Sequence, residues 1–167
     1  MKNQSMTINW LECQENELEN TDRQLVQAAR EATGGSYSPY SGFRVGAAVL
    51  LEDGTIVTGS NQENAAYPSG LCAERCALFS ASHQYPEKAV VALAIAARDS
   101  KGYTNNPITP CGACRQVIAE TEARYGKPIR FVLYGTSRTI ILADGISSLL
   151  PFCFGAEALT DTVSQSE

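Results

Sequence analysis

The chain has 167 residues, of which 44% are hydrophobic and 19% are charged, and its net charge is −5. This length and composition fit one domain and exclude a disordered, collagen-like or coiled-coil protein. The longest apolar run, residues 89–97, is about half of what a bilayer span needs, and the N-terminal residues lack the hydrophobic stretch of a secretory signal. An acidic chain also lacks the basic face that avid nucleic-acid binding needs. We therefore expect a cytoplasmic protein that binds a small molecule, with neither nucleic acid nor a membrane as partner.

The periodicity of the sequence predicts alternating helices and strands. In chain order these are an edge strand over 6–13, a helix from residue 20 to the Gly34-Gly35 pair, strands over 45–51 and 55–59, a helix from about residue 72 to Pro86, a strand over 90–97, a helix from Pro110, and strands over 129–134 and 139–143. Asp22 is the expected N-cap of the first helix. The run VVALAIAA, residues 90–97, is typical of a strand buried on both faces. The order predicts an α/β fold, a three-layer α/β/α sandwich around a mixed, about five-stranded sheet.

Three of the six cysteines have a spacing that indicates a metal site. Cys72 and Cys111 stand where two helices are expected to begin, and Cys114 follows Cys111 by three residues, so that these two share a helix face. Three thiolates suit zinc and leave its fourth position for water, as in a catalytic site. Glu74 lies in the same first turn as Cys72, where it can face that water as a proton carrier. Cys-x-Glu followed by Pro-Cys-x-x-Cys is the pattern of zinc deaminases.

Other interpretations of these residues remain. The three cysteines could be buried structural thiols, or Cys111 and Cys114 could be a redox pair, which would leave Cys72 and Glu74 unexplained. His83, the only histidine, lies about 16 Å along the helix from Cys72, too far to share a metal. The remaining cysteines are interpreted as a core residue and two ordinary thiols: Cys76, Cys13 and Cys153.

Three stretches together resemble a known family. They are SYSPYSGFRVGAAVLLEDGTIVTGSNQENAAYPSGLCAER, PCGACRQVIAE and LLPFCFG. Their motifs are similar to those of the small homotetrameric cytidine deaminases, and the resemblance covers residues 20–160. It implies a cytidine deaminase-like catalytic domain over 20–160, with an N-terminal extension over 1–19 and a polar tail over 161–167. It also implies a homotetramer with one Zn²⁺ per subunit.

The resemblance implies a role for each matching residue. Cys72, Cys111 and Cys114 match zinc ligands, and Glu74 matches the proton shuttle. The substrate-binding residues implied in this way are Phe43, Asn61, Glu63, Ala65, Ala66, Tyr67, Ala73 and Phe154. Asn61 and Glu63 match the pair that holds the ribose hydroxyls, and Phe154, or alternatively Phe152, matches an aromatic that reaches a neighbouring subunit's base.

Three thiolates leave a zinc site with a formal charge of −1, which weakens its pull on water. Arg75, directly after Glu74, is the candidate to offset this charge by hydrogen bonding to a ligand sulfur.

The leading functional hypothesis is hydrolytic deamination of cytidine and deoxycytidine to uridine and deoxyuridine, with release of ammonia, in pyrimidine salvage. One alternative is deamination of another aminopyrimidine nucleoside, such as an antibiotic of the blasticidin kind. A polynucleotide deaminase is another, against which the acidic charge argues. A zinc-stabilised binding module without catalysis is the alternative from a different class of protein.

Overall fold

The computed structural model describes residues 1–160, and the expected polar tail over 161–167 lies outside them. The strands are β1 (Leu11–Cys13), β2 (Arg44–Leu51), β3 (Ile56–Ser60), β4 (Val90–Asp99), β5 (Gly102–Tyr103), β6 (Arg130–Leu133) and β7 (Thr139–Leu142). The α-helices are α1 (Asn20–Ala32), α2 (Ala73–Gln84), α3 (Gly112–Tyr125) and α4 (Glu157–Thr160). Short 3-10 turns lie at Glu15–Glu17, Thr33–Gly35, Tyr67–Ser69 and Gly145–Ser148. No helix among residues 1–160 combines the length and apolarity needed to cross a membrane.

All strands belong to one mixed sheet, in the order β1-β7-β6-β4-β2-β3, with β5 paired to β4. Among the strands of residues 1–160, β4 and β6 are the only neighbours that run parallel, and the helix α3 lies between them in the chain. The sheet has seven strands rather than about five, since the short β1 and β5 extend it. An edge strand is present near the N-terminus, but it covers Leu11–Cys13 instead of residues 6–13. Elements of two or three residues are too short to show a period of two in the sequence.

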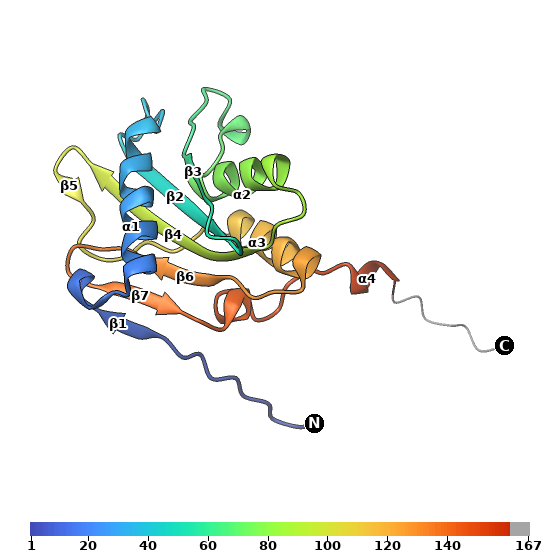
Figure 1. Ribbon diagram of the computed structural model, residues 1–167. Helices are drawn as coiled ribbons and strands as arrows, with labels where there is room; N and C mark the ends of the chain where they lie inside the picture. The colour runs from blue at the N-terminus through green and yellow to red at the C-terminus, as the bar shows by residue number, and fades with distance from the viewer. Residues whose placement is uncertain (161–167) are drawn as a thin grey trace.

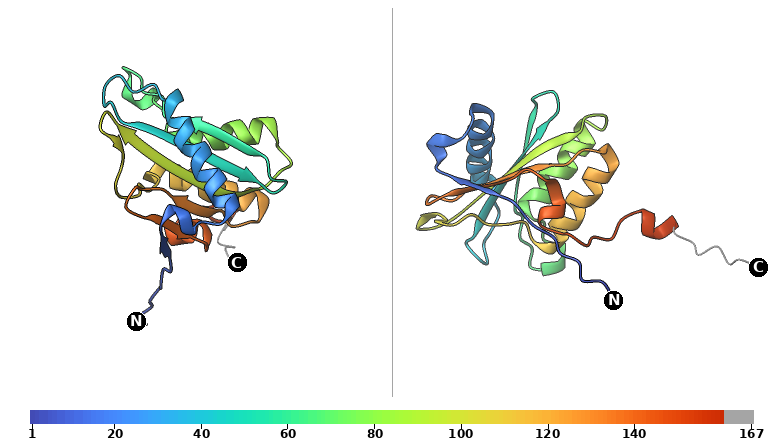
Figure 2. Two further views of the ribbon diagram at one scale, coloured as in Figure 1. Left: turned by 60° about the vertical axis from the view of Figure 1, so that its left-hand side comes forward. Right: turned by 90° about the horizontal axis from the view of Figure 1, so that it is seen from below.

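Helices cover both faces of this sheet (Figures 1 and 2). Helix α1 lies on one face, and α2 and α3 lie together on the other. The expected three-layer α/β/α sandwich is thus confirmed. Strand β4 shows why it forms, because Leu93 and Ile95 belong to the core on the α2 and α3 side, while alanines of the same strand belong to the core under α1. Both faces of β4 are buried, as the apolar run predicted.

Two glycines set how closely the helices approach the sheet. A Cβ atom at Gly46 of β2 would lie 2.0 Å from the carbonyl oxygen of Ala29 in α1. A Cβ atom at Gly59 of β3 would lie 2.3 Å from the backbone nitrogen of Ala77 in α2. Real Cβ atoms do not make such short contacts, so each helix depends on the missing side chain of the glycine beneath it.

The expectation that Asp22 caps α1 is wrong. The N-cap is Glu19, and Asp22 lies within the first turn, where it is 2% exposed. Its carboxylate forms an ion pair with Arg130 of β6. A buried carboxylate needs such a partner, and this long-range partner is not visible in the local sequence.

Residues 11–18 of the N-terminal extension pack against the domain. Strand β1 pairs with β7, and Glu12 forms an ion pair with Arg138, which lies 126 residues further along the chain. Leu18 is buried in the core under α1. This part of the extension therefore completes one edge of the sheet and one side of the core.

Candidate metal centre and active site

The two cysteines expected at helix starts are the N-caps of two neighbouring helices. Cys72 is the N-cap of α2 and Cys111 is the N-cap of α3, both with extended backbone. Neither side chain makes a capping hydrogen bond, so neither thiol is occupied by the backbone of its own helix. Cys114 lies in the first turn of α3 and is fully buried. The positive ends of both helix dipoles therefore face the same group of sulfur atoms, which favours thiolates.

The spacing of the three sulfur atoms fits a zinc ion. The Sγ atom of Cys111 lies 3.7 Å from that of Cys72 and 3.5 Å from that of Cys114, and all three lie within 4.8 Å of one another. Tetrahedral zinc with Zn–S bonds of about 2.3 Å places its sulfur ligands about 3.8 Å apart. The donor set agrees as well, since thiolates are preferred zinc ligands.

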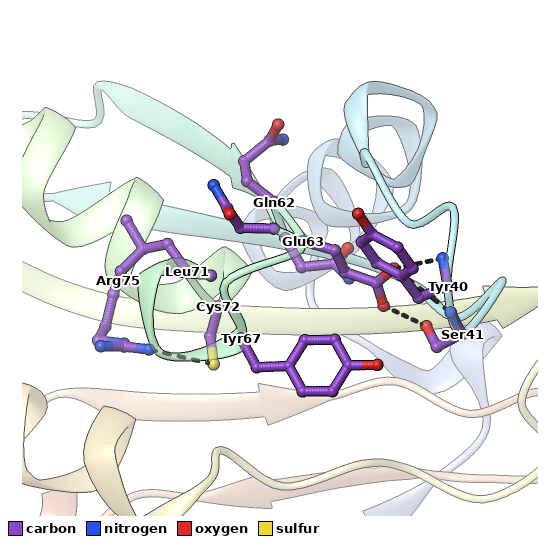
Figure 3. Close-up of a pocket in the computed structure, with 11 residues that line it drawn as sticks. Tyr40, Ser41, Gln62, Glu63, Tyr67, Leu71, Cys72 and Arg75 are labelled. Carbon is purple, nitrogen blue, oxygen red and sulfur yellow. Dashed lines mark hydrogen bonds between the residues drawn. The ribbon is translucent and has the colours of Figure 1, made fainter.

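The charge at the sulfur cluster is shared unequally. Hydrogen bonding from the Cys114 thiol and then from Arg75 lowers the pKa of Cys72 to about 5, while the pKa of Cys114 is raised by its bond to Cys72. The guanidinium Nη2 of Arg75 lies 3.6 Å from the Cys72 sulfur (Figure 3). Arg75 therefore stands where the charge argument from the sequence places it. Because zinc binds thiolates, its binding to this cluster releases protons.

Glu74 lies beside the sulfur cluster in a small cavity of about 200 Å³. The cavity is lined by Val45, Asn61, Cys72, Ala73, Glu74, Ile108, Thr109 and Cys111. The side chain of Glu74 is 5% exposed, and burial raises its carboxyl pKa. A buried carboxyl group with a raised pKa is suited to take up and give back a proton.

A larger cavity of about 530 Å³, whose lining is drawn in Figure 3, shares lining residues with the small one. It is lined by Tyr40, Ser41, Asn61, Gln62, Glu63, Asn64, Tyr67, Gly70, Leu71, Cys72 and Arg75. Asn61 and Cys72 line both cavities, which makes them the boundary between the two. A ligand with a ring in the small cavity and a polar appendage in the large one would fit, because the small cavity has aliphatic walls at Val45 and Ile108 and the large one holds Glu63.

The amide of Asn61 is held by three hydrogen bonds. Its Oδ1 atom accepts from the Ser36 hydroxyl at 2.6 Å and from the Val45 backbone N–H at 2.8 Å. Its Nδ2 atom donates to the carbonyl oxygen of Phe43 at 3.0 Å. An amide has two N–H donors and two acceptor sites. Asn61 therefore keeps one N–H for a ligand and has no strong acceptor left.

The carboxylate of Glu63 is held by the loop that precedes β2. Its Oε2 atom accepts from the backbone N–H groups of Tyr40 at 2.8 Å and Ser41 at 3.3 Å. Its Oε1 atom accepts from the Ser41 hydroxyl at 2.5 Å (Figure 3). The hydroxyl of Ser41 and then the Tyr40 N–H lower the carboxyl pKa of Glu63, so the group is an ionised acceptor at neutral pH.

The other residues implied by the resemblance are divided between the cavities and the surface. Tyr67 lines the large cavity and Ala73 lines the small one. Four residues line neither cavity: Phe43, Ala65, Ala66 and Phe154. Phe154 is exposed, and its carbonyl oxygen accepts a hydrogen bond from Gln116 of α3 at 2.7 Å. Phe152 is also exposed.

Several site residues were not singled out by sequence reasoning: Ser36, Tyr40, Ser41, Val45, Ile108 and Thr109. The first four belong to the stretch that carries the family resemblance, and Thr109 directly precedes the Pro-Cys-x-x-Cys motif. Their places next to the recognised motifs were the signal in the sequence that could have marked them as site residues. Ser36, Tyr40 and Ser41 contact residues that lie 22 to 25 positions further along the chain, which the local sequence does not reveal.

Residues 19–126 match the family of the cytidine and deoxycytidylate deaminase zinc-binding region. The chain is 44% identical to a cytidine deaminase of Halalkalibacterium halodurans, over 84% of this chain and 99% of that protein. It is 39% identical to a cytidine deaminase of Mycobacterium tuberculosis, over 78% of this chain and 87% of that protein. Among solved structures, it is similar to the cytidine deaminase of Burkholderia pseudomallei with a TM-score of 0.67 and 37% identity, over 78% of this chain and 97% of that one.

A sandwich fold with a three-thiol centre beside a buried carboxyl group fits a zinc-dependent hydrolase, and the comparisons agree with this class. The chain belongs to the cytidine and deoxycytidylate deaminase family.

Proposed function

We propose that the protein deaminates cytidine and deoxycytidine by hydrolysis, giving uridine or deoxyuridine and ammonia, and that it serves pyrimidine salvage. The observation that carries this proposal is the position of Glu74, a buried carboxyl group in the same cavity as Cys72 and Cys111. A proton carrier beside a metal-binding cluster is what a hydrolytic deaminase needs.

Cys72, Cys111 and Cys114 are the proposed ligands of one zinc ion per subunit. A zinc ion bound there supplies Lewis acidity, which makes a water molecule acidic enough to attack at neutral pH. The small cavity beside the three cysteines gives water and substrate access to one side of the cluster. Arg75 offsets part of the charge of the three thiolates through its contact with the Cys72 sulfur.

Glu74 is the proposed proton shuttle. Its carboxylate accepts a proton from the attacking water and passes it to N3 of the cytosine ring, while the water oxygen forms a bond to C4. It then transfers the second water proton to the 4-amino group, whose bond to C4 breaks, and ammonia leaves. Burial helps both transfers, because a raised carboxyl pKa makes protonated Glu74 a readily formed species.

The remaining residues are proposed to hold the nucleoside. The small cavity, with Val45, Ile108 and Ala73 in its walls, takes the base. Asn61 donates its spare N–H to a ribose hydroxyl, and Glu63 accepts from one. Phe43 and the backbone of Ala65, Ala66 and Tyr67 complete the nucleoside pocket.

The proposed active form is a homotetramer in which an aromatic side chain of one subunit reaches the base in its neighbour. Phe154 is our candidate, with Phe152 as the alternative. Both rings are exposed and line neither cavity of their own chain, which supports a role outside it. We place the enzyme in the cytoplasm, where a reducing environment keeps metal-binding thiols available.

The test is incubation of the zinc-loaded protein with cytidine while the ultraviolet absorbance of the cytosine ring is followed. We expect conversion to uridine that stops with a strong chelator and returns with zinc. Glu74→Gln should bind zinc normally and lose about 100-fold to 10,000-fold in kcat. Absence of turnover in the fully zinc-loaded protein would overturn the proposal.

Matched variants separate the finer points. We compare KM and the mass in solution for two variants, Phe154→Ala and Phe152→Ala. The donated aromatic is the one whose removal raises KM while the tetramer stays intact. A monomeric active enzyme would exclude this arrangement. A cytosine-containing single-stranded oligonucleotide serves as the competing substrate, and preference for it over free cytidine would favour the polynucleotide alternative.

A further inference from the structure

We propose that Ser41 is a positioning residue for Glu63, whose carboxylate it fixes so that one acceptor site faces the nucleoside. This inference deepens the proposed function and rests on it for the identity of the ligand. Its basis is the hydrogen-bond network between the loop over 36–43 and the segment over 61–63.

The backbones of these two segments are tied together. The Tyr37 N–H donates to the carbonyl oxygen of Asn61 at 3.1 Å, and the Glu63 N–H donates to the carbonyl oxygen of Tyr37 at 2.8 Å. Ser41 and Glu63 are thus carried by backbones in a fixed relation to each other. The side chain of Glu63, in contrast, comes from a half-buried loop residue and has several rotatable bonds. Its orientation depends on the groups that bind its carboxylate.

The Ser41 hydroxyl has a defined direction. Its oxygen accepts a hydrogen bond from the Phe43 backbone N–H at 3.0 Å and lies 2.5 Å from Oε1 of Glu63. An ionised carboxylate only accepts hydrogen bonds, so the hydroxyl proton points at Glu63. The loop backbone therefore orients the hydroxyl, and the hydroxyl, whose hydrogen bond to Glu63 is drawn in Figure 3, orients the carboxylate.

The capacity of the carboxylate shows what is left for a ligand. A carboxylate has about four acceptor sites, of which Glu63 uses two on Oε2 and one on Oε1. Asn61 keeps one N–H donor, as described above. Together the two side chains offer one donor and one acceptor, the complement of a single hydroxyl group. Without Ser41, Oε1 of Glu63 would lose its only protein donor among residues 1–160 and its fixed direction.

The experiment measures binding as well as turnover, so that it does not depend on catalysis. The variants are Ser41→Ala, the conservative Ser41→Thr, and Ser38→Ala as the matched control. Ser38 lies on the same loop, and its hydroxyl makes no hydrogen bond within the described part of the chain. The probes are uridine and 2′,3′-dideoxyuridine, which lacks both hydroxyls that Glu63 could bind.

For Ser41→Ala we expect a Kd for uridine about tenfold higher, the usual effect of losing a hydrogen bond to a charged group. The Kd for 2′,3′-dideoxyuridine should stay unchanged, and KM for cytidine should rise while kcat is kept. Ser41→Thr should restore most of the affinity, and Ser38→Ala should match the wild type. In a Glu63→Gln background, Ser41→Ala should add little.

An equal loss of affinity for both probes, or none for either, would overturn the positioning role, as would a fall in kcat alone. Wild-type protein that binds uridine through its hydroxyls without deaminating cytidine would contradict the proposed function and leave the role of Ser41 supported. Wild-type protein that binds neither probe would overturn both.

Discussion

Gly59 offers a direct test of how the sheet positions the site. A Cβ atom at this position would lie 2.3 Å from the backbone nitrogen of Ala77 and 2.6 Å from the carbonyl oxygen of Ala73, whereas ordinary contacts begin at 3.4 Å. Both contacts involve backbone atoms of α2, which no rotamer change can move away. The variant Gly59→Ala must therefore separate β3 from α2 by roughly 1 Å, an overpacking that costs about 3 kcal/mol.

The displacement also reaches the metal centre, because α2 begins immediately after Cys72 and carries Glu74 in its first turn. A shift of about 1 Å in reacting groups can lower catalysis about 100-fold. We therefore expect Gly59→Ala to lower the melting temperature by about 10 °C and kcat/KM for cytidine by about 100-fold. Thermal unfolding monitored by circular dichroism and the ultraviolet deamination assay measure the two effects.

Gly34→Ala is the matched control, because a Cβ atom at Gly34 meets nothing within 4 Å. It should keep both the melting temperature and the activity of the wild type. If Gly59→Ala also kept the wild-type melting temperature, the close approach of α2 to β3 and the positioning argument built on it would be refuted.

Three further predictions concern the site and the core. Arg75→Ala should keep its zinc, as measured by metal analysis. Its kcat should fall about tenfold or more, because the negative charge of the third thiolate is no longer offset by the guanidinium. Full turnover would mean that another group balances this charge. Phe131→Ala should cost about 3–5 kcal/mol in urea unfolding, since the ring is fully buried, and a loss below about 1 kcal/mol would contradict this packing. Oε1 of Glu122 accepts from the backbone N–H groups of Ile129 and Ile146, so Glu122→Ala should destabilise by about 2 kcal/mol or more in the same assay, while Glu122→Gln keeps the acceptor. Burial raises the carboxyl pKa of Glu122, so the stability that protonation of this group contributes is present at low pH and is lost as the pH rises through the raised pKa. The free energy of unfolding of the Gln variant should therefore increase relative to that of the wild type as the pH rises above the ordinary pKa of 4.5. A difference between the two proteins that does not change with pH would argue against the raised pKa.

The metal centre was the most predictable part of the structure. Two short motifs, each at a helix start, encode it locally, because a helix turn alone brings Cys111 and Cys114 onto one face. The contact that brings Cys72 of α2 to the two cysteines of α3 is non-local. It could be predicted because zinc needs more ligands than Cys111 and Cys114 supply.

The hydrogen-bond partners of the site were much less predictable. The donors that hold Glu63 lie 22 and 23 residues earlier in the chain, at Ser41 and Tyr40. The misassigned cap shows the same limit, because Asp22 is a good capping residue by type but lies inside the helix and pairs with Arg130, 108 residues away. The periodicity of a sequence shows which face of a helix or strand is apolar. The partner of a polar side chain depends instead on which distant segment of the chain packs beside it in the fold.

The pairing of β1 with β7 has a consequence during protein synthesis. Glu12 and Arg138 are 126 residues apart, and a ribosome adds about 5–20 residues per second. Strand β1 is therefore synthesised between about 6 and 25 seconds before its partner strand exists. Strand β1 is thus paired late, and Trp10 and Leu11, still exposed in the folded chain, are accessible to chaperones once they have left the ribosome.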